Sequence, residues 1–374
     1  MKTHIAEFVS PGHPDRLADA VVESCVALAI SRDPDALVGL ECAVHTDMVF
    51  LDGRIAGGRG APCVTPEELE GVVRDVYRAA GYGGKWIPAP EALRIVQNVC
   101  LEALSDDERA IRTVSDDQNV VMGYACNSPA TDYLPVAPYV ANALGRRLAA
   151  WRAGEADRFG PDFKVLVSLC EEGGGRWRWN RLTVSIQHAA GVYAGEQHAA
   201  VRPVADSVLE GLEARGLAGL GELPAERFIL NGAGDFIVGG PEGDNGLSGK
   251  KLVVDFYGPE VPIGGGAICG KDPHKVDVCG AFRARQLALD LVRRQGAAAA
   301  TVRLGWTPGD AMPAYREALL QDSLGFQRPL PDDVLPPADW FSIEATVHDL
   351  DLVRLDRRRR MLDGYFTGPM MRGL

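Results

Sequence analysis

GGGAICGKDPHKVD, at residues 264–277, packs four glycines, two lysines and two aspartates into fourteen residues. Glycines have no Cβ, so their backbone N–H groups can come close to an anion. The two lysines are four residues apart and can hold phosphate oxygens as point charges. Aspartates beside them suit Mg²⁺, which commonly bridges a carboxylate and a phosphate. The stretch therefore predicts a polyphosphate site.

The same stretch almost matches the phosphate-loop pattern GxxxxGK[ST], read from Gly265 to Lys271. The next residue is Asp272, so the hydroxyl that normally meets Mg²⁺ is missing. An Asp-Pro pair is also a poor start for the helix that this pattern requires. A phosphate-loop nucleotide hydrolase and a glycine-rich turn without a ligand therefore stay as alternatives at this point.

Length and composition narrow the class of protein. A chain of 374 residues is too long for one ordinary hydrophobic core, which favours two or three domains. A net charge of −12 makes a nucleic-acid partner unexpected. Neither a transmembrane run of about 18 apolar residues nor a signal peptide is evident. Eight scattered cysteines without a CxxC pair are typical of reduced thiols, so we expect a cytoplasmic protein without a membrane partner.

Hydrophobic periodicity predicts a mixture of helices and strands. The clearest helix start is Thr65-Pro66-Glu67-Glu68, a capping box with proline at the first helical position. Helices are predicted at 14–31, 66–80, 137–152, 196–215 and 276–295, with a helical or mixed segment at 91–104. Strands are predicted at 37–45, 47–51, 119–125, 164–170, 177–188, 227–231, 235–239, 251–257 and 299–305. No regular βαβ period is visible, which favours an α+β fold.

Polar and Gly/Pro-rich segments suggest where domains meet. Such segments lie at 105–109 and 216–225. We therefore predict an N-terminal domain at 1–104, a central domain at 115–220 and a C-terminal domain at 226–374, interleaved in space.

Three further motifs contain charged residues of types that bind ligands or metals. SPGHPDR at 10–16 places a histidine and an aspartate at a helix start, where they can offer a hydrogen-bond donor and a metal ligand. GGPEGDNGLSGKK at 239–251 again joins glycines to a lysine pair, and SDDQN at 115–119 holds two carboxylates. Each motif taken alone also suits an ordinary helix start, hairpin loop or surface turn.

Taken together, four motifs resemble the S-adenosylmethionine synthetase (methionine adenosyltransferase) family in order and spacing. They are GHPDR, DDQNVVMGYA, GGPEGDNGLSGKKLVVDFYG and GGGAICGKDPHKVD, and the resemblance runs over residues 5–295. It implies three similar sheet-plus-helix domains in a pseudo-threefold arrangement, and a homodimer with the active site at the interface. It also implies adenosyl transfer from ATP to methionine sulfur. The tripolyphosphate that leaves is then cleaved to phosphate and pyrophosphate.

The resemblance also implies roles for individual residues. Catalytic roles fall to His13, Lys164 and Lys271. Asp15 and Asp277 would bind Mg²⁺, and Glu41 would bind K⁺. The residues implied to bind ATP and its phosphates are Asp117, Phe236, Lys250, Lys251, Gly265, Gly266 and Lys275. Asp117 and Asp244 would meet the ribose or the ammonium group of the amino acid.

The sequence departs from the family pattern on the amino-acid side. Arg54 stands where the family has a Glu that helps to hold the methionine ammonium, and a guanidinium would repel that group unless it turns away. Lys250 stands where the family has Arg. The sulfur pocket near 304–306 is rewritten, and Trp306 could fill it. The arginine run at 357–360 is expected to be a solvated face or a salt-bridge strip between subunits.

These departures leave two alternatives within the family. One is a diverged paralogue that keeps ATP and triphosphate chemistry but uses another amino acid, a thiol or water as nucleophile. The other is a non-catalytic regulatory member. The retained set of His13, Asp15, Lys271 and Asp277 argues against a purely regulatory role.

Overall fold

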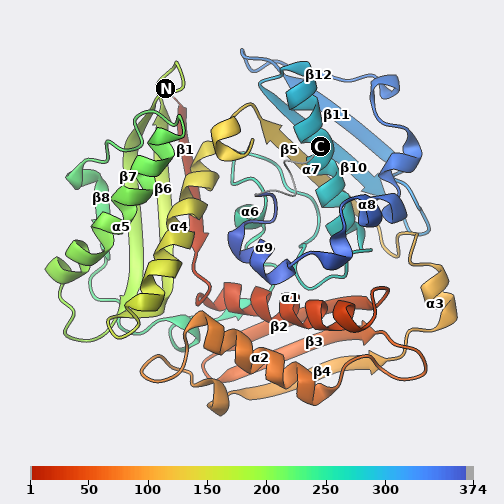
Figure 1. The fold of residues 1–374 in the computed structure, drawn as a ribbon, viewed down its shortest axis with the longest axis horizontal. Coiled ribbons are helices and arrows are strands. Elements are labelled where there is room, and N and C mark those ends of the chain that lie inside the picture. Colours follow the sequence, from red (N-terminus) through yellow and green to blue (C-terminus); the bar gives the residue numbers. More distant parts are fainter. Residues whose placement is uncertain (1, 368–374) are drawn as a thin grey trace.

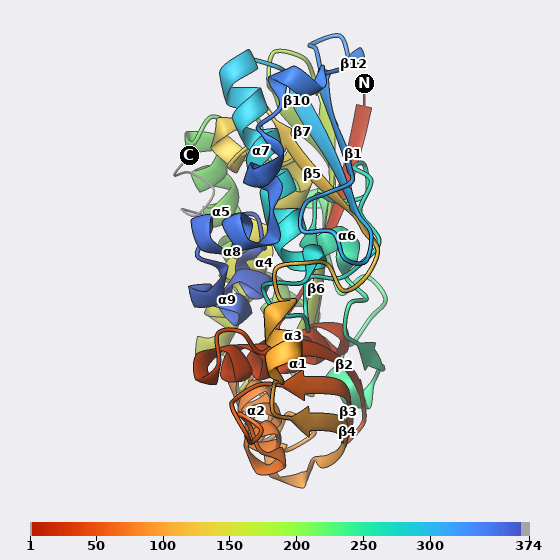
Figure 2. The same cartoon turned by 90° about the vertical axis from the view of Figure 1, so that its right-hand side faces the viewer.

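A computed structural model of the chain describes residues 2–367. Its strands form three sheets of four strands each, arranged around a centre that contains α6 (Leu252–Asp255) and α9 (Arg357–Asp363) (Figure 1). Seen from the side, the longer helices lie toward one side of the molecule and the sheets toward the other (Figure 2). The predicted α+β class and the pseudo-threefold arrangement of sheet-plus-helix units are confirmed.

The first unit has the strand order β1-β6-β7-β8 and is covered by α4 and α5. Its elements are β1 (Lys2–Val9), α4 (Val136–Gly154), β6 (Phe159–Glu171), β7 (Trp177–His188), α5 (Ala194–Ala214) and β8 (Phe228–Leu230). Inward-facing residues of these elements form a hydrophobic core of their own.

The second unit has the order β4-β3-β2-β9 and the third has the order β12-β11-β10-β5. The second unit contains α1 (Pro14–Arg32), β2 (Leu37–His45), β3 (Met48–Ala56), α2 (Pro66–Ala80), β4 (Arg94–Glu102) and β9 (Gly246–Leu247). The third contains β5 (Asn119–Cys126), α7 (Val276–Gln295), β10 (Ala299–Trp306), β11 (Tyr315–Gln321), β12 (Gln327–Pro329) and α8 (Ile343–Asp349). The short helix α3 (Asp106–Ala110) lies between the second and third units (Figure 1). One continuous core joins both units.

Each sheet combines segments that are far apart in the chain. β1 pairs antiparallel with β6, from Lys2 opposite Glu171 to Val9 opposite Lys164. β5 pairs with β10, and β9 pairs with β2. The contiguous ranges 1–104, 115–220 and 226–374 therefore do not coincide with the three sheets, and their boundaries stay a prediction.

Local capping explains why the predicted helices form where they do. Thr65 accepts the N–H of Glu68 while the Glu68 side chain accepts the N–H of Thr65, so α2 begins at Pro66. α7 ends at Gly296, whose φ of 60° is a left-handed conformation that glycine adopts without strain. None of the helices within 2–367 is both long and apolar enough to cross a membrane.

Three secondary-structure predictions were wrong. Residues 94–102 form strand β4, parallel to β3, rather than a helical or mixed segment. Residues 235–239 form no strand, and the N–H of Phe236 donates to the His188 ring instead. Residues 252–255 form the short helix α6, although the apolar run favours a strand. This helix places Asp255 against the buried Arg16, at 2.7 Å, and that tertiary contact outweighs the local propensity.

Candidate active site

The acidic face of α1 holds both glycine-rich loops in place. Asp15, Asp19 and Glu23 are spaced by four residues, so they lie on one face of the helix, and all three are buried. They accept backbone N–H groups at 3.1, 2.8 and 3.0 Å from Leu247, Gly249 and Gly270, respectively. Because backbone amides donate to buried carboxylates here, α1 positions the loop 239–251 and the loop 264–271 together.

Asp272 anchors the second loop to β2. Its buried carboxylate accepts the N–H groups of Val38 and His274, each at 2.9 Å, and pairs with Arg112. Although burial opposes ionisation, the contacts with His274 and Arg112 hold the pKa of Asp272 well below its usual range. The residue that breaks the phosphate-loop pattern is therefore an internal anchor, not a replacement for the missing hydroxyl.

The first cluster of predicted residues surrounds the start of α1, and we call it the His13 cluster: His13, Asp15, Lys164, Lys250 and Lys251. His13 is the N-cap of α1, and its Nδ1 accepts the N–H of Asp15 at 3.2 Å. A neutral imidazole that accepts at Nδ1 carries its proton on Nε2. Nε2 is buried and has no hydrogen-bond partner among residues 2–367. His13 thus has one buried N–H donor that is not used.

The His13 cluster has one carboxylate among three lysines, and two of these lysines pair with it. Burial, followed by the Lys164 ammonium, lowers the pKa of His13 to about 3, so its ring is neutral at ordinary pH. Asp15 lies 3.0 Å from the Lys251 ammonium and 3.4 Å from that of Lys250. Burial opposes the charge of Asp15, but the Leu247 amide and Lys251 outweigh it and lower its pKa.

The second cluster lies on the loop 264–271 and the start of α7, and we call it the loop cluster: Gly266, Lys271, Lys275, Asp116 and Asp277. The Lys271 ammonium lies 2.7 Å from Oδ1 of Asp277, and Lys275 pairs with Asp116. A Cβ on Gly266 would lie 1.7 Å from that same Oδ1, so the loop approaches Asp277 as closely as glycine allows.

A cavity of about 550 Å³ opens beside the loop cluster. Its lining includes Lys271, Asp277, Asp117 and Trp306. Gly265 also lines it. The structure thus brings the glycine loop, the DDQN segment and the rewritten segment at 304–306 to one space, large enough for a small ligand.

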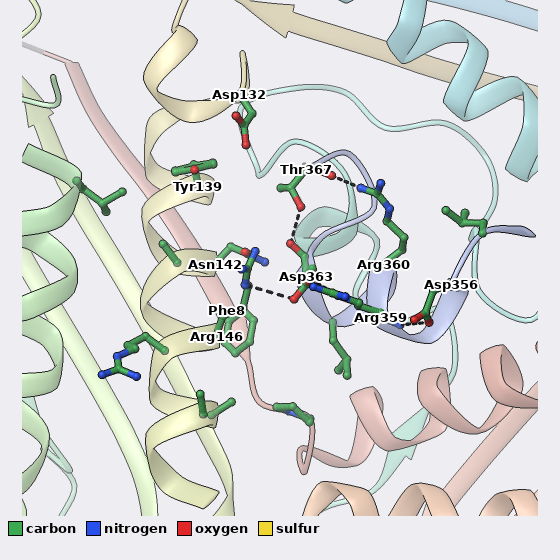
Figure 3. Close-up of a pocket in the computed structure, with 18 of the residues that line it drawn as sticks. Phe8, Asp132, Tyr139, Asn142, Arg146, Asp356, Arg359, Arg360, Asp363 and Thr367 are labelled. Carbon is green, nitrogen blue, oxygen red and sulfur yellow. Dashed lines mark hydrogen bonds and ion pairs between the residues drawn. The ribbon is translucent and has the colours of Figure 1, made fainter. Parts of the chain in front are cut away.

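A larger cavity, of about 1180 Å³, lies elsewhere, between α4 and the C-terminal segment (Figure 3). Arginines and aspartates of both sides line it, and Arg146 of α4 pairs with Asp363 of α9 at 3.3 Å. None of the predicted site residues is among the described residues that line this cleft. Size alone therefore does not locate the site.

Comparison with known proteins settles the family. Models of the S-adenosylmethionine synthetase N-terminal, central and C-terminal domains match residues 2–99, 112–236 and 238–321. The chain belongs to the S-adenosylmethionine synthetase family. It is accordingly a methionine adenosyltransferase-like transferase.

Individual relatives agree with this assignment. An S-adenosylmethionine synthase of Zymomonas mobilis is 36% identical over 320 residues, covering 82% of this chain and 78% of the relative. One of Hyphomonas neptunium is 34% identical, covering 84% and 79%. The solved structure of an unusual S-adenosylmethionine synthetase from Campylobacter jejuni has a TM-score of 0.81 at 22% identity, covering 99% of this chain and 95% of that one. The common fold thus extends into the C-terminal third, beyond residue 295 where the motif resemblance ends.

The structure also shows how Lys164 of the His13 cluster is exposed, and where three predicted residues outside both clusters lie: Asp244, Phe236 and Arg54. Lys164 is exposed on β6, opposite Val9 of β1. Asp244 is exposed near the His13 cluster, and Phe236 is half-buried beside His188. Arg54 pairs with Glu102 at 2.8 Å and with Glu108 at 2.7 Å, so in-chain carboxylates neutralise its charge.

The family uses divalent and monovalent cations. Different carboxylates of this chain suit each kind of ion. No group of three candidate metal ligands exists within residues 2–367. Mg²⁺ needs only one or two carboxylates when phosphates and water supply the rest, so Asp15 and Asp277, each beside a lysine, suit Mg²⁺ that is also bound to phosphate. Glu41 is exposed and accepts the Ser248 hydroxyl, which leaves carboxylate oxygen for K⁺.

Sequence reasoning missed four charged residues at the site. Asp19 and Glu23 hold the two loops from α1. Asp162 accepts the Gly240 N–H at 2.8 Å, and burial raises its pKa to about 6. Arg357 was expected on a solvated face or in a salt-bridge strip between subunits, but it is buried against the loop cluster. The four-residue spacing of Asp15, Asp19 and Glu23 was the one signal available.

Proposed function

We propose that the protein transfers the adenosyl group of ATP to the sulfur of methionine. A lone pair of sulfur forms the new bond to C5′, and the C5′–O bond breaks with its electron pair leaving on the tripolyphosphate. The product is the sulfonium S-adenosylmethionine. Water then cleaves the tripolyphosphate to phosphate and pyrophosphate. ATP and methionine are the substrates that the family assignment supports.

One observation carries this proposal: each carboxylate assigned to Mg²⁺ is paired with a lysine assigned to phosphate. Asp15 pairs with Lys251 at 3.0 Å, and Asp277 pairs with Lys271 at 2.7 Å. A bound Mg²⁺–polyphosphate would supply the opposite charge to both members of each pair. The metal would meet the carboxylates and the phosphate oxygens would meet the ammonium groups.

The residues of the two clusters contribute positioning and charge. His13 offers its Nε2–H to the C5′ oxygen as negative charge develops there, and a neutral donor does this without repelling Mg²⁺. Lys164, Lys250, Lys251, Lys271 and Lys275 neutralise the leaving group. Mg²⁺ held by Asp15 and Asp277 would stabilise the same charge as a Lewis acid, and K⁺ at Glu41 would steady the loop at Ser248. Phe236 would stack on adenine, and Asp117 and Asp244 would hold ribose or the ammonium group.

A homodimer would complete the site. No hydrogen bond or ion pair joins a side chain of the His13 cluster to one of the loop cluster in the part of the chain described. Each sheet carries exposed apolar residues, for example Leu166, Phe50 and Val120. We propose that these faces pair, so that the His13 cluster of one protomer meets the loop cluster of its partner.

Two observations favour an alternative in which a nucleophile other than methionine is used. Trp306 occupies the wall of the cavity beside Asp277, and Arg54 replaces the acidic residue expected near the amino-acid ammonium. A diverged member with this site would keep ATP and triphosphate cleavage but would use another amino acid, a thiol or water.

The deciding experiment incubates the protein with ATP, Mg²⁺, K⁺ and methionine and measures products by mass spectrometry. We expect S-adenosylmethionine, phosphate and pyrophosphate, and we expect Lys271→Ala to abolish all three. The matched control is Lys85→Ala, an exposed lysine that pairs with Asp157. Triphosphate cleavage without the sulfonium would favour the alternative nucleophile, and no ATP turnover with any nucleophile would indicate a regulatory member.

A further inference from the structure

Arg357, the first residue of α9, is buried beneath the loop cluster. Its side chain is 2% exposed although it begins a run of four arginines. Its Nη2 donates to the Lys271 carbonyl at 2.7 Å, to the Ile268 carbonyl at 3.3 Å and to Oε1 of Glu23 at 2.9 Å. The matched family domains end at residue 321, so this residue lies outside them.

Two of the three acceptors of Arg357 bracket one short turn of the phosphate loop. Ile268 and Lys271 are its two ends, and between them the N–H of Gly270 donates to the same Glu23 oxygen at 3.0 Å. The carbonyl of Lys271 and its ammonium belong to one residue. Fixing the carbonyl therefore limits where the ammonium can point.

Stability is a poor explanation for this arrangement. Nε and Nη1 of Arg357 and Oε2 of Glu23 are buried and have no hydrogen-bond partner among the described residues. A buried ion pair with unsatisfied atoms is often no more stable than an apolar pair of the same volume. Two of the three hydrogen bonds of Arg357 go to loop carbonyls, and the third goes to Glu23, which itself accepts a loop amide, so the arrangement points to a role in loop geometry.

We propose that Arg357 is a positioning residue that holds the loop 264–271 so that Lys271 meets the polyphosphate. This inference rests on the proposed function for the role of Lys271, but the positioning can be measured without any substrate.

A matched control lies two residues away on the same helix. Arg359 faces the large cleft (Figure 3), its side chain is 77% exposed, and it pairs with Asp363 at 3.3 Å. Arg359→Met removes the same charge from α9 without touching the loop. Three test variants are Arg357→Met, Arg357→Lys and the double variant Glu23→Gln with Arg357→Met.

The first measurement is amide hydrogen exchange of the ligand-free protein over residues 264–271. The double variant removes both buried charges and keeps an amide oxygen for the Gly270 N–H, so we expect a melting temperature near that of the wild type. Exchange in the loop should nevertheless rise about tenfold, because the two carbonyls have lost their donor. Arg357→Lys should give an intermediate rise, since one ammonium reaches fewer of the acceptors, and Arg359→Met should give none.

The second measurement is the affinity for inorganic tripolyphosphate with Mg²⁺, by calorimetry. We expect about tenfold weaker binding for the double variant, in keeping with the sensitivity of such sites to small displacements, and no change for Arg359→Met. Wild-type loop exchange and affinity in both Arg357→Lys and the double variant would overturn the proposal, as would an equal effect of Arg359→Met. A wild type that fails to bind tripolyphosphate would instead contradict the proposed function, while loop exchange would still decide the role of Arg357.

Discussion

The ammonium of Lys271 lies 2.7 Å from Oδ1 of Asp277, and Gly266 is the residue that lets them meet. A Cβ at residue 266 would stand 1.7 Å from Oδ1 and 3.0 Å from the ammonium nitrogen. Both are ends of side chains rather than backbone. An added methyl group would therefore push the charged groups aside without unfolding the loop.

Gly266→Ala should leave the protein folded and lower kcat/KM for ATP by about 100-fold, because displacement of catalytic groups by about 1 Å costs this much. Gly265→Ala is the comparison, since its Cβ would find its nearest neighbour, Oδ1 of Asn119, at an ordinary 3.5 Å. Its loss should be much smaller. Steady-state kinetics and circular dichroism on both variants check this, and equal losses would contradict the geometry.

Asp272→Ser completes the phosphate-loop pattern but should not create a phosphate loop. The substitution leaves the guanidinium of Arg112 buried without its carboxylate, which destabilises a protein by about 3–5 kcal/mol. Urea denaturation measures the change. Asp157→Ser is the control, because its side chain is 99% exposed and the expected change is within about 0.5 kcal/mol. A serine variant as stable as the wild type would show that Asp272 is no anchor.

Local signals were enough to predict the longer helices, α1, α2, α4, α5 and α7. The capping box at Thr65 predicted a helix at 66–80, and α2 has these bounds. The predicted helix at 276–295 is α7. Both succeed because caps and periodicity act within a few residues. β4 and α6 were missed because their conformations depend on pairing with β3 and with Arg16, which no local pattern encodes.

The predicted site residues were found through motifs, whereas the residues that support them were not. Asp19 is 230 residues from Gly249, and Glu23 is 334 residues from Arg357. A run of four arginines is normally solvated, and nothing within it distinguishes the buried Arg357 from the exposed Arg359. Only the folded chain shows which charge faces the loop.

The buried, neutral His13 should make stability depend on pH. Its pKa is about 3 in the folded protein and near 6.5 in the unfolded chain. Between these values the unfolded chain binds the extra proton, so the contribution of His13 to stability is complete above about pH 6.5 and is lost as pH falls toward 3. His13→Asn keeps a helix cap and cannot titrate.

Thermal melting of both proteins from pH 4 to pH 8 checks this expectation. The melting temperature of the wild type should fall more steeply on the acid side than that of His13→Asn, and the two curves should run parallel above about pH 7. Parallel curves over the whole range would mean that the pKa of His13 is the same in the folded and unfolded states.

Substitution of Trp306 should change the KM for methionine much more than the KM for ATP. It lines the cavity beside Asp277, and its ring packs so closely on α7 that a Cβ at Gly280 would lie 2.9 Å from its Cζ3. If the indole forms a wall for the methionine side chain, Trp306→Leu should raise KM for methionine about tenfold and change KM for ATP by less than about twofold. Trp151→Leu, in the first sheet unit against Phe159, should change neither constant. A lower KM for methionine in Trp306→Leu would instead mean that the indole fills the sulfur pocket, and the wild type would then use another nucleophile.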